Sequence, residues 1–501
     1  MLPETIHETA ERFDDRIAYI SADGWPFSYR MLDQFSDETA GGLARRGVVE
    51  GSVVAMLLPS GIEYLVAYAA LAKLGAVCAG INPRFEAGER RSVVAAAEAD
   101  LVISTSELSD GLASDTPVAL IEPASDGEAV VNELRISDYV PTVLTPNPDR
   151  PVAICFTSGS TGEPKGALFT NRQLEAVRQL DTGGAWGAAG HTIAPTEFAH
   201  VGFMTKWPWL IAGGGTTHLQ HKWRAARVLE LIHQHRMTAV SGVAAQIALL
   251  LRQPEFDSYD FSAVTTIVAG AAASPPALVT EARERFGANY LIRYSSTESG
   301  GVGLSTTPGA ADEEALYSIG RPRAGVQAEI RDSDLQPVAT GDVGELWLRS
   351  PAVMAEYWRN PRATEEALRD GWLRTGDLAR VDESGLYRLS GRVSEMFIRG
   401  GYNVYPLEVE AVLGLHPQVR DVVVVPRADP VMGEVGVAVV IPNDPDRPIS
   451  LADLRIHGGT TLAAYKLPEA LEVATSFPMN ASQKVDRRAL QRLLAEQPRN
   501  Y

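Results

Sequence analysis

Apolar runs of strand length alternate with amphipathic stretches over about residues 20–320 of the chain. The strand-like runs lie at 53–58, 101–104, 152–156, 239–240 and 265–269. Helical spacing of apolar positions predicts helices between them, near 61–74, 86–98, 171–180 and 225–235. This alternation predicts an α/β fold in which helices cover parallel sheets. In such folds ligands bind where loops leave the carboxyl ends of the strands.

The pattern changes near residue 320, where short strands broken by turns predict a small β subdomain up to residue 391. Beyond it, a helix near 406–414, strands at 421–425 and 435–441, and a helix near 451–462 predict a compact α+β unit of about 110 residues. We therefore expect a large N-terminal domain, residues 1–391, and a small, mobile α+β C-terminal domain, residues 392–501. A tight hinge near 391–393 would join them.

Composition supports a folded protein and argues against one class of partner. Of the 501 residues, 45% are apolar and 22% are charged, which is within the globular range. The formal charge of −18 is the opposite of what a nucleic-acid binder needs to displace phosphate counterions. An acidic chain that binds an anion such as ATP must recruit it through local backbone N–H groups, a few cationic side chains and Mg²⁺.

Cysteine content and hydropathy point to the cytoplasm. Cys78 and Cys155 are the only cysteines, both in apolar surroundings, so a reducing compartment fits and a disulfide framework is excluded. Residues 1–16 are too acidic for a secretory signal. The most apolar segment, near 64–81, contains Lys73 and two glycines and has the spacing of a buried helix face, so we expect no membrane span.

The segment 157–166 reads TSGSTGEPKG and directly follows the strand-like run 152–156. Glycines let backbone N–H groups converge on an anion, while hydroxyls and a lysine add further contacts, so the segment is a candidate phosphate loop. The residues that would hold phosphate are Thr157, Ser158, Gly159, Ser160, Thr161, Gly162 and Lys165. The spacing differs from that of a Walker loop, and taken alone the segment is equally consistent with a flexible Ser/Gly turn.

Four further segments follow in order: YSSTE at 294–298, LRTGD at 373–377, GR at 391–392 with GGYNVYPLEVE at 400–410, and NASQKVDR at 480–487. With these five segments, the chain resembles the adenylate-forming superfamily over nearly its whole length, and within it the branch of the acyl-CoA synthetases. Luciferases and the adenylation domains of peptide synthetases belong to the same superfamily. The resemblance implies ATP, Mg²⁺ and coenzyme A as cofactors and a small carboxylic acid as substrate.

The resemblance also implies roles for individual residues of the nucleotide site. Glu298 would position Mg²⁺, with the hydroxyl of Thr297 beside it facing the phosphates, and Mg²⁺ chemistry agrees because this ion takes hard oxygen ligands. The remaining implied nucleotide contacts are Gly270, Ala271 and Ala272 along the adenine, Tyr294 stacked on it, Asp377 at the ribose hydroxyls, and Arg392 near the same nucleotide. Without the resemblance, a lone Glu, a Gly-Asp turn and a surface arginine would each be ordinary solvated features.

Lys484 is the implied catalytic lysine. A substrate carboxylate would attack the α-phosphorus of ATP and expel pyrophosphate, and a cation aimed at the growing charge stabilises the transition state. The thiol of coenzyme A would then attack the acyl-adenylate after the C-terminal domain rotates about a hinge at Ser394. Gly400 and Gly401 would let the backbone approach the pantetheine channel.

Three positions depart from the family pattern. The hinge residue is usually Asp or Lys but here is Ser394, Ser295 replaces a glycine, and Gln483 replaces the glycine before the catalytic lysine. None of these changes removes a reacting group. They leave open the rate and the efficiency of domain exchange.

Residues 197–203 resemble the segment that lines the acyl site, with His200 matching its usual histidine. The predicted substrate pocket is lined by His200, Val201, Met204 and Gly270. No acidic group is placed to pair with a substrate ammonium, so a fatty, aromatic or steroid-type acid is favoured over an amino acid. The histidines in HLQH at 218–221 and HQH at 233–235 lack a cysteine or a third ligand at helical spacing, which disfavours a metal site there.

The leading hypothesis is thus an AMP-forming carboxylate–CoA ligase. One alternative is acyl transfer to a carrier protein or another acceptor, and another is a low-turnover protein that binds nucleotides or acyl-adenylates. The presence of Lys484, Glu298 and Asp377 argues against the binding protein. The oligomeric state is left open, with a homodimer as one option.

Overall fold

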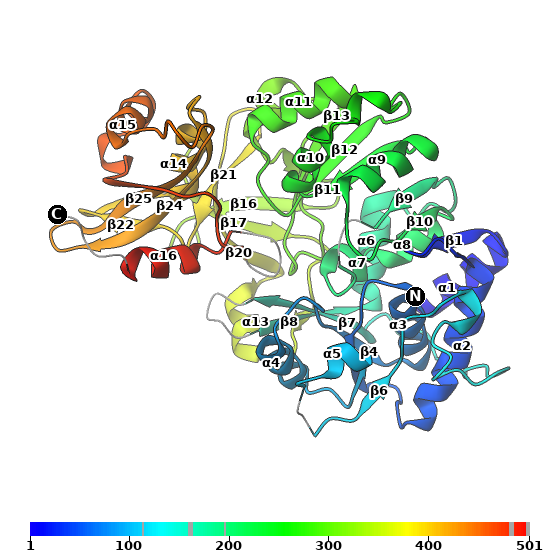
Figure 1. Ribbon diagram of the computed structural model, residues 1–501. Helices are drawn as coiled ribbons and strands as arrows, with labels where there is room; N and C mark the ends of the chain where they lie inside the picture. Colours follow the sequence, from blue (N-terminus) through cyan, green and yellow to red (C-terminus); the bar gives the residue numbers. More distant parts are fainter. Residues whose placement is uncertain (113–114, 159–163, 195–196, 480–484, 497–501) are drawn as a thin grey trace. The chain divides into compact units, whose positions relative to one another are not determined.

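The computed structural model describes residues 1–112, 115–158, 164–194, 197–479 and 485–496 (Figure 1). The chain forms two compact units, and each is described by itself. The first comprises Met1–Ala328 and Leu348–Arg374, and the second comprises Glu329–Trp347 and Thr375–Tyr501. Residues 375–391 thus group with the C-terminal residues by compactness. The expected boundary at 391–392 concerns a hinge motion and stays a prediction.

The largest sheet of the first unit has seven strands in the order β18-β8-β7-β4-β3-β5-β6. Its strands are β3 (Val53–Leu57), β4 (Val77–Gly80), β5 (Leu101–Ser104), β6 (Val118–Leu120), β7 (Pro151–Ser158), β8 (Pro164–Thr170) and β18 (Glu356–Tyr357). Strands β3 to β7 run parallel, and β8 and β18 are antiparallel additions at one edge. The predicted runs 53–58, 101–104 and 152–156 are confirmed as strands.

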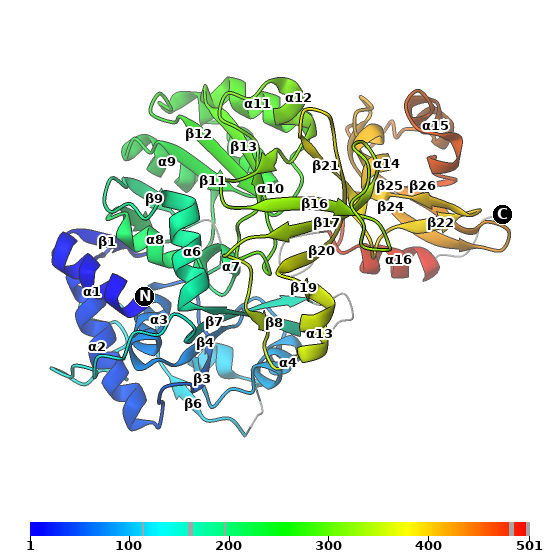
Figure 2. The same ribbon diagram turned by 180° about the vertical axis from the view of Figure 1, so that it is seen from behind.

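Helices pack on both faces of this sheet because its central strands are apolar on both sides. Val54 and Met56 of β3 belong to the core that includes α3 (Ile62–Leu74), whereas Val53 and Ala55 pack with α4 (Ala87–Ala97) (Figure 2). Since neighbouring strand residues point to opposite faces, the two helices cover opposite sides.

Lys73, near the end of the apolar helix α3, is buried and forms ion pairs with Asp33 and Asp37 at 2.6 Å each. These pairs explain how α3 accommodates a charge in the core. No helix in the described ranges has both the length and the apolar character needed to cross a membrane.

The first unit also contains two smaller sheets. One has the order β11-β12-β13-β14-β15, with β11 (Ala239–Gly242), β12 (Thr266–Gly270) and β13 (Asn289–Tyr294) parallel and β14 (Leu304–Ser305) and β15 (Arg321–Pro322) antiparallel. The other has the order β2-β1-β10-β9, formed by β1 (Ile17–Ile20), β2 (Pro26–Ser28), β9 (His191–Ile193) and β10 (Thr216–His218). The remaining helices of this unit are α1 (Leu2–Phe13), α2 (Tyr29–Arg45), α5 (Ser106–Ser109), α6 (Asn171–Thr182), α7 (Val201–Met204), α8 (Trp207–Ala212), α9 (Ala225–Gln234), α10 (Ala244–Leu251), α11 (Pro276–Phe286), α12 (Asp312–Tyr317) and α13 (Pro361–Ala367).

A further sheet has the order β16-β17-β20-β19, with β21 paired to β20. Its strands are β16 (Gln327–Arg331), β17 (Gly344–Arg349), β19 (Leu368–Arg369), β20 (Trp372–Val381) and β21 (Tyr387–Arg392). These strands confirm the β-rich character predicted for residues 320–391.

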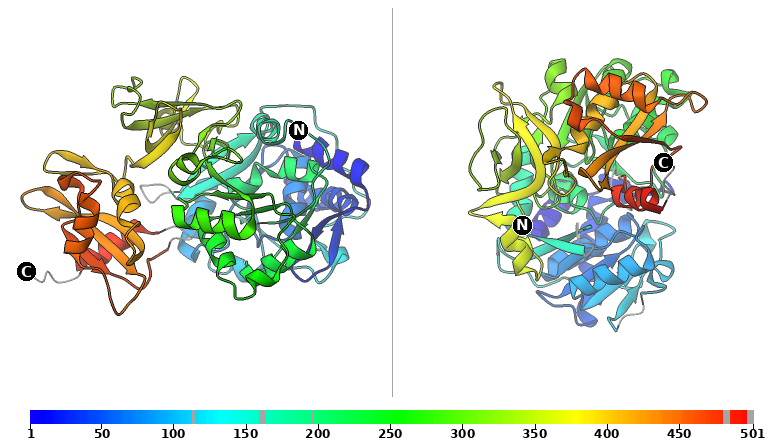
Figure 3. Two further views of the ribbon diagram at one scale, coloured as in Figure 1. Left: turned by 90° about the horizontal axis from the view of Figure 1, so that it is seen from above. Right: turned by 90° about the vertical axis from the view of Figure 1, so that its left-hand side faces the viewer.

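The C-terminal residues of the second unit form a sheet in the order β23-β22-β25-β24, with β26 paired to β25. Its elements are β22 (Phe397–Arg399), β23 (Tyr402–Val404), α14 (Pro406–Leu413), β24 (Val419–Asp429), β25 (Gly433–Pro442), α15 (Leu451–Gly459), β26 (Ala470–Val473) and α16 (Arg487–Glu496). Successive valines of β24 belong to two separate hydrophobic cores. Val422 and Val424 pack with α14 and α15, and Val423 packs with Leu490 of α16. Figure 1 and the right-hand view of Figure 3 accordingly show α15 and α16 on opposite sides of the sheet. The predicted α+β fold of this region is confirmed.

Candidate active site

The predicted phosphate loop joins two antiparallel strands, β7 and β8. Thr157 and Lys165 are cross-strand partners, and the Thr157 hydroxyl donates to the Lys165 carbonyl at 3.4 Å. Lys165 is therefore the second residue of β8, and its position is fixed by strand pairing. Gly159, Ser160, Thr161 and Gly162 lie outside the described residues, as does the side chain of Ser158.

Thr297 and Glu298 lie in a tight turn that follows the end of β13. The Ser296 N–H donates to the Ser299 hydroxyl oxygen at 2.9 Å, and the Ser299 N–H donates to the Ser296 hydroxyl oxygen at 3.1 Å. The Gly300 N–H closes the turn on the Thr297 carbonyl at 3.0 Å. These reciprocal bonds hold the backbone of Glu298 in one conformation, as a metal-positioning carboxylate requires.

Tyr357 links the Glu298 turn to the phosphate hairpin. Its hydroxyl donates to Glu298 Oε1 at 2.7 Å, and the Lys165 ammonium lies 5.5 Å from the centre of its ring. Strand β18 pairs with β8, which places Tyr357 opposite Ala167, and the Met354 N–H donates to the Glu298 carbonyl at 2.8 Å. Burial, together with the charge of Glu298, raises the pKa of Tyr357 well above its ordinary value, so the phenol stays a protonated donor.

The sequence analysis did not find Tyr357. The only sequence signal is an aromatic pair, Tyr357-Trp358, shortly before Pro361, and such pairs are common in cores. Its partner Glu298 is 59 positions away, so only the folded chain reveals the contact.

The predicted adenine contacts lie at the carboxyl ends of two neighbouring parallel strands. Gly270 ends β12, Tyr294 ends β13, and Gly270 is the cross-strand partner of Arg293. A Cβ at Gly270 would lie 3.1 Å from the Arg293 carbonyl oxygen, so glycine suits this close approach. Ala271 follows with φ +64°, an unusual conformation for alanine that turns the exposed 271–272 backbone away from the strand.

The predicted acyl segment lies against the Glu298 turn. His200 precedes α7, and its Nε2 lies 3.0 Å from Asn82 Nδ2. The Thr205 hydroxyl donates to the Gly300 carbonyl at 3.1 Å, which ties the end of α7 to the turn. A Cβ built on Gly301 would lie 3.9 Å from a methyl of Val201. His200 and Val201 are thus in the neighbourhood that an acyl group bound near Glu298 would need.

Met204 lies deeper in the same unit. It is fully buried, its sulfur is 3.7 Å from Cys155 Sγ, and its carbonyl accepts a bond from the Tyr68 hydroxyl at 3.0 Å. Trp207, three residues further on, is also fully buried and donates to the Tyr19 hydroxyl at 2.8 Å. Both residues pack in the core beneath the acyl segment.

A buried charge cluster that the sequence analysis missed lies next to the acyl segment. The Asp181 carboxylate, 2% exposed, accepts bonds from Lys206 at 2.8 Å and Arg323 at 2.6 Å, and Arg293 lies 3.9 Å away. Burial raises the pKa of Asp181, but Lys206 and Arg323 outweigh this effect and the net pKa is lowered. A Cβ built on Gly301 would lie 3.1 Å from Lys206 Cε. The ion cluster therefore packs directly against the residues that follow the Glu298 turn.

In the second unit, Asp377 and Arg392 are cross-strand partners on β20 and β21. Arg392 Nε lies 2.9 Å from Asp377 Oδ1, with the Asp377 side chain 10% exposed and that of Arg392 57% exposed. The Asp377 N–H donates to the Thr375 hydroxyl oxygen, which itself donates to the Leu346 carbonyl. The structure thus brings together the two residues predicted to bind the ribose and its surroundings.

The predicted hinge and coenzyme A residues follow directly. Ser394 is exposed in a turn that the N–H groups of Glu395 and Met396 close on the Arg392 carbonyl, at 3.1 and 3.0 Å. Gly400 and Gly401 form the two-residue turn between β22 and β23, with φ +54° and +89°. A hairpin turn of this type needs positive φ at both positions, which glycine adopts without strain. Lys484 lies outside the described residues.

Comparison with known proteins places this geometry in a family. Residues 6–358 match the AMP-binding enzyme family, and residues 408–484 match its C-terminal domain. The chain therefore belongs to the AMP-binding enzymes, and the family resemblance noted from the sequence motifs is confirmed.

The curated relatives include an indoleacetate–CoA ligase from Aromatoleum aromaticum, 32% identical over 97% of this chain and 95% of that protein. A feruloyl-CoA synthase from an Amycolatopsis species is 33% identical over 92% and 93%. Among solved structures, an amide bond synthetase from Marinactinospora thermotolerans has a TM-score of 0.88 at 28% identity, covering 99% of this chain and 100% of that one. The predicted α/β fold with a small C-terminal domain agrees with this structural match.

Proposed function

We propose that the protein uses ATP to convert a carboxylic acid into an acyl-adenylate and then transfers the acyl group to the thiol of coenzyme A. The observation that carries this proposal is the contact chain from Lys165 through Tyr357 to Glu298, beside the strand ends at Gly270 and Tyr294. The family and its CoA-ligase relatives confirm the predicted class, an AMP-forming acid–thiol ligase.

The surroundings of Glu298 suit Mg²⁺. A carboxylate and a neighbouring hydroxyl are hard oxygen ligands, and Mg²⁺ in nucleotide sites commonly takes one or two carboxylates together with phosphate oxygens. Glu298 would hold the ion through the oxygen that Tyr357 does not engage, with Thr297 beside it. When bound, Mg²⁺ neutralises charge on the phosphate oxygens.

The first half-reaction joins a carboxylate oxygen of the substrate to the α-phosphorus of ATP. The bond from that phosphorus to the β-phosphate bridging oxygen breaks, and pyrophosphate leaves with its electron pair. Lys165, at the start of β8, supplies a cation for the departing phosphates, and Lys484 is the proposed donor to the oxygens of the α-phosphate. In the second half-reaction the coenzyme A sulfur attacks the acyl carbon, AMP leaves, and the thiol proton is released.

We assign the acid to the aromatic class, as in indoleacetate and ferulate, the acids named in the two relatives above. The carboxylates beside the acyl segment are already paired, which disfavours an amino-acid substrate. Glu197 forms an ion pair with Arg84 at 2.7 Å and accepts a bond from Ser60 at 2.8 Å, while Asp181 is held by Lys206 and Arg323. Neither carboxylate is available to a substrate ammonium.

A panel of carboxylic acids, assayed for pyrophosphate and for acyl-CoA with and without coenzyme A, tests the proposal. Aromatic acids should release pyrophosphate and form a thioester only when coenzyme A is present. Preference for fatty acids would refute the aromatic assignment. An absence of pyrophosphate with every acid would support a binding protein instead.

A second acceptor is suggested by the amide bond synthetase, whose fold matches this chain at a TM-score of 0.88. The same assay with an amine in place of coenzyme A distinguishes the two acceptors, since an amide product would appear without a thiol.

The two cysteines are buried free thiols, which is consistent with the cytoplasmic location proposed from the sequence. Light scattering of the purified protein would determine its oligomeric state, which the sequence leaves open with a homodimer as one option.

A further inference from the structure

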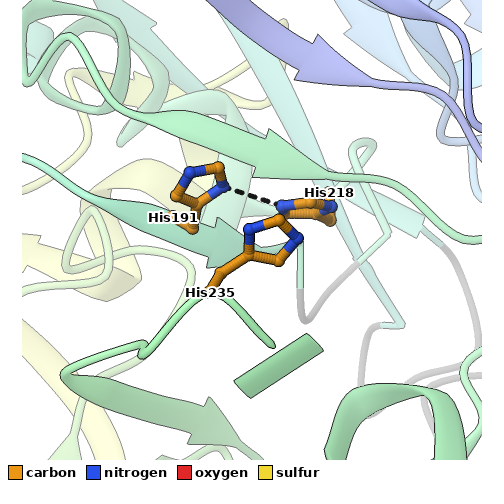
Figure 4. A group of neighbouring side chains, drawn as sticks. All are labelled: His191, His218 and His235. Carbon is orange, nitrogen blue, oxygen red and sulfur yellow. Dashed lines mark hydrogen bonds between the residues drawn. The ribbon is translucent and has the colours of Figure 1, made fainter. Parts of the chain in front are cut away.

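Three histidines gather in the first unit, apart from the residues assigned to the proposed reaction (Figure 4). His191 begins β9, His218 ends β10, and His235 follows the last residue of α9. The strands are parallel, with His191 level with Thr216. Because residues two apart on a strand share a face, the side chains of His191 and His218 lie on the same side of the sheet. His235 meets them there from the end of α9.

The three rings are in direct contact. His191 Nδ1 and His218 Nε2 are 2.9 Å apart and share a hydrogen bond. The ring centre of His235 lies 4.2 Å from that of His191 and 4.4 Å from that of His218. One nitrogen from each ring falls within 4.8 Å of those of the other two. Among the described residues, no other side chain hydrogen-bonds to these rings.

The neighbouring histidines in the sequence do not join this cluster. His221 pairs with Asp23 at 3.0 Å, and His233 Nδ1 accepts a bond from the Asp260 N–H at 3.0 Å. The sequence analysis weighed HLQH and HQH as local motifs and found no third ligand. In the folded chain, one histidine of each motif, His218 and His235, lies beside His191, which no local sequence pattern indicated.

Each imidazole can bind a metal ion through the lone pair of one ring nitrogen when its proton is on the other nitrogen. Arg227 is close enough to oppose a cation, but its charge is paired with Glu230 at 2.8 Å.

We propose that His191, His218 and His235 bind one borderline divalent transition-metal ion, of which Zn²⁺ is the type case, with water in the fourth position. Zn–N bonds of about 2.0–2.1 Å in a tetrahedral site put two nitrogens about 3.4 Å apart. One of the two nitrogens now hydrogen-bonded at 2.9 Å carries the shared proton, so that ring must hold its proton on its other nitrogen when the ion binds. The two nitrogens must also move apart by about 0.5 Å, which small side-chain rotations supply. Nitrogen ligands select such ions over Mg²⁺ and Ca²⁺, which prefer oxygen.

The bound ion would fasten two parts of the first unit. His191 and His218 belong to the four-stranded sheet, whereas His235 lies at the turn from α9 into β11, the first strand of the five-stranded sheet. An ion held by all three binds the native state and not the unfolded chain, so it raises the melting temperature. The proposal does not rest on the ligase activity.

The first experiment uses the full-length untagged protein, treated with EDTA, dialysed and kept free of nucleotide. Zn²⁺ titration by calorimetry should show one equivalent bound. At a hundredfold excess over Kd, Tm should rise by about 3 °C for a unit of this size. Mg²⁺ at the same concentration should leave Tm unchanged. Failure of Zn²⁺ to bind, or an equal shift with Mg²⁺, overturns the proposal.

Matched variants then locate the ion. His235→Gln should weaken Zn²⁺ binding at least tenfold, whereas His221→Gln, which changes an exposed histidine nearby, should stay within twofold of wild type. Wild-type affinity in His235→Gln contradicts the assignment. X-ray absorption at the zinc edge of the wild-type complex gives an answer that needs no variant: three imidazole ligands support the site, and fewer overturn it.

Discussion

Replacing Tyr357 by Phe removes one hydroxyl from the middle of the proposed active site. The ring is 8% exposed, so phenylalanine keeps its packing and leaves the Lys165 ammonium over the same ring face. What is lost is the 2.7 Å bond to Glu298 Oε1. The carboxylate then lacks the donor that fixes its orientation, and the oxygen proposed for Mg²⁺ is free to turn.

The size of the effect follows from the charge on the acceptor. A hydrogen bond to an ionised group contributes about 1.5–3 kcal/mol. If that energy holds Glu298 in its reactive position, its loss slows adenylate formation by about 10- to 150-fold, at 1.36 kcal/mol per factor of ten. The Mg²⁺ concentration for half-maximal rate should rise as well, because the ion must now order its own ligand.

ATP–pyrophosphate exchange with Mg²⁺ varied at saturating ATP measures both effects. Tyr29→Phe is the matched control: Tyr29 is 2% exposed, and its hydroxyl donates at 2.7 Å to the Gly215 carbonyl, in a part of the unit that carries none of the residues proposed for the ligase reaction. That variant should lose stability but keep its Mg²⁺ dependence. If Tyr357→Phe stays within twofold of wild type in rate and in Mg²⁺ requirement, Tyr357 does not position Glu298.

Three other substitutions test separate parts of the site. Lys484→Ala should slow pyrophosphate release by about 10²–10³ and leave thioester formation from a supplied acyl-adenylate largely intact, so loss of both half-reactions would contradict its assigned role. Glu298→Gln should raise the Mg²⁺ requirement, and full adenylation at limiting Mg²⁺ would count against a metal role. Asp181→Asn leaves Lys206 and Arg323 without their counter-charge and should cost about 3–5 kcal/mol in a urea melt. Since the folded pKa of Asp181 lies below its ordinary value, wild type keeps this stabilisation above about pH 4 and loses it below, so the two proteins should converge in stability at acid pH.

The central sheet could be predicted from the sequence because burial on both faces leaves an unbroken apolar run. All five residues of β3 are buried, and so are all four of β5, so each appears as a strand without help from its partners. The same reasoning placed the phosphate segment after β7. It did not show that the segment is a hairpin, because the pairing of Lys165 with Thr157 depends on the folded structure and leaves no local signal in the sequence.

Short strands with polar residues were beyond prediction for a physical reason. Strand β18 is two residues long and β9 is three, so neither carries a periodic signal, and each is a strand only because a longer neighbour supplies the hydrogen bonds. These are the elements that carry Tyr357 and His191. The contacts that matter most for the positioning of Glu298 and for the proposed metal site therefore come from segments whose sequence alone is uninformative.

The path of the chain places Tyr357 and Glu298 in the same compact unit. After Ala328 the chain leaves the first unit, and from Leu348 to Arg374 it returns and adds β18 to the edge of the seven-stranded sheet. Lys165, Glu298 and Tyr357 consequently lie within one compact unit, whereas Asp377, Arg392 and the predicted hinge residue Ser394 belong to the other. A rotation at Ser394 between the two half-reactions would leave the Tyr357–Glu298 bond intact.

It follows that Tyr357→Phe should impair adenylate formation and spare thioester formation from a supplied acyl-adenylate, whereas a hinge substitution such as Ser394→Pro should do the reverse. Equal losses in both half-reactions for Tyr357→Phe would mean that its bond to Glu298 also serves the thioester step.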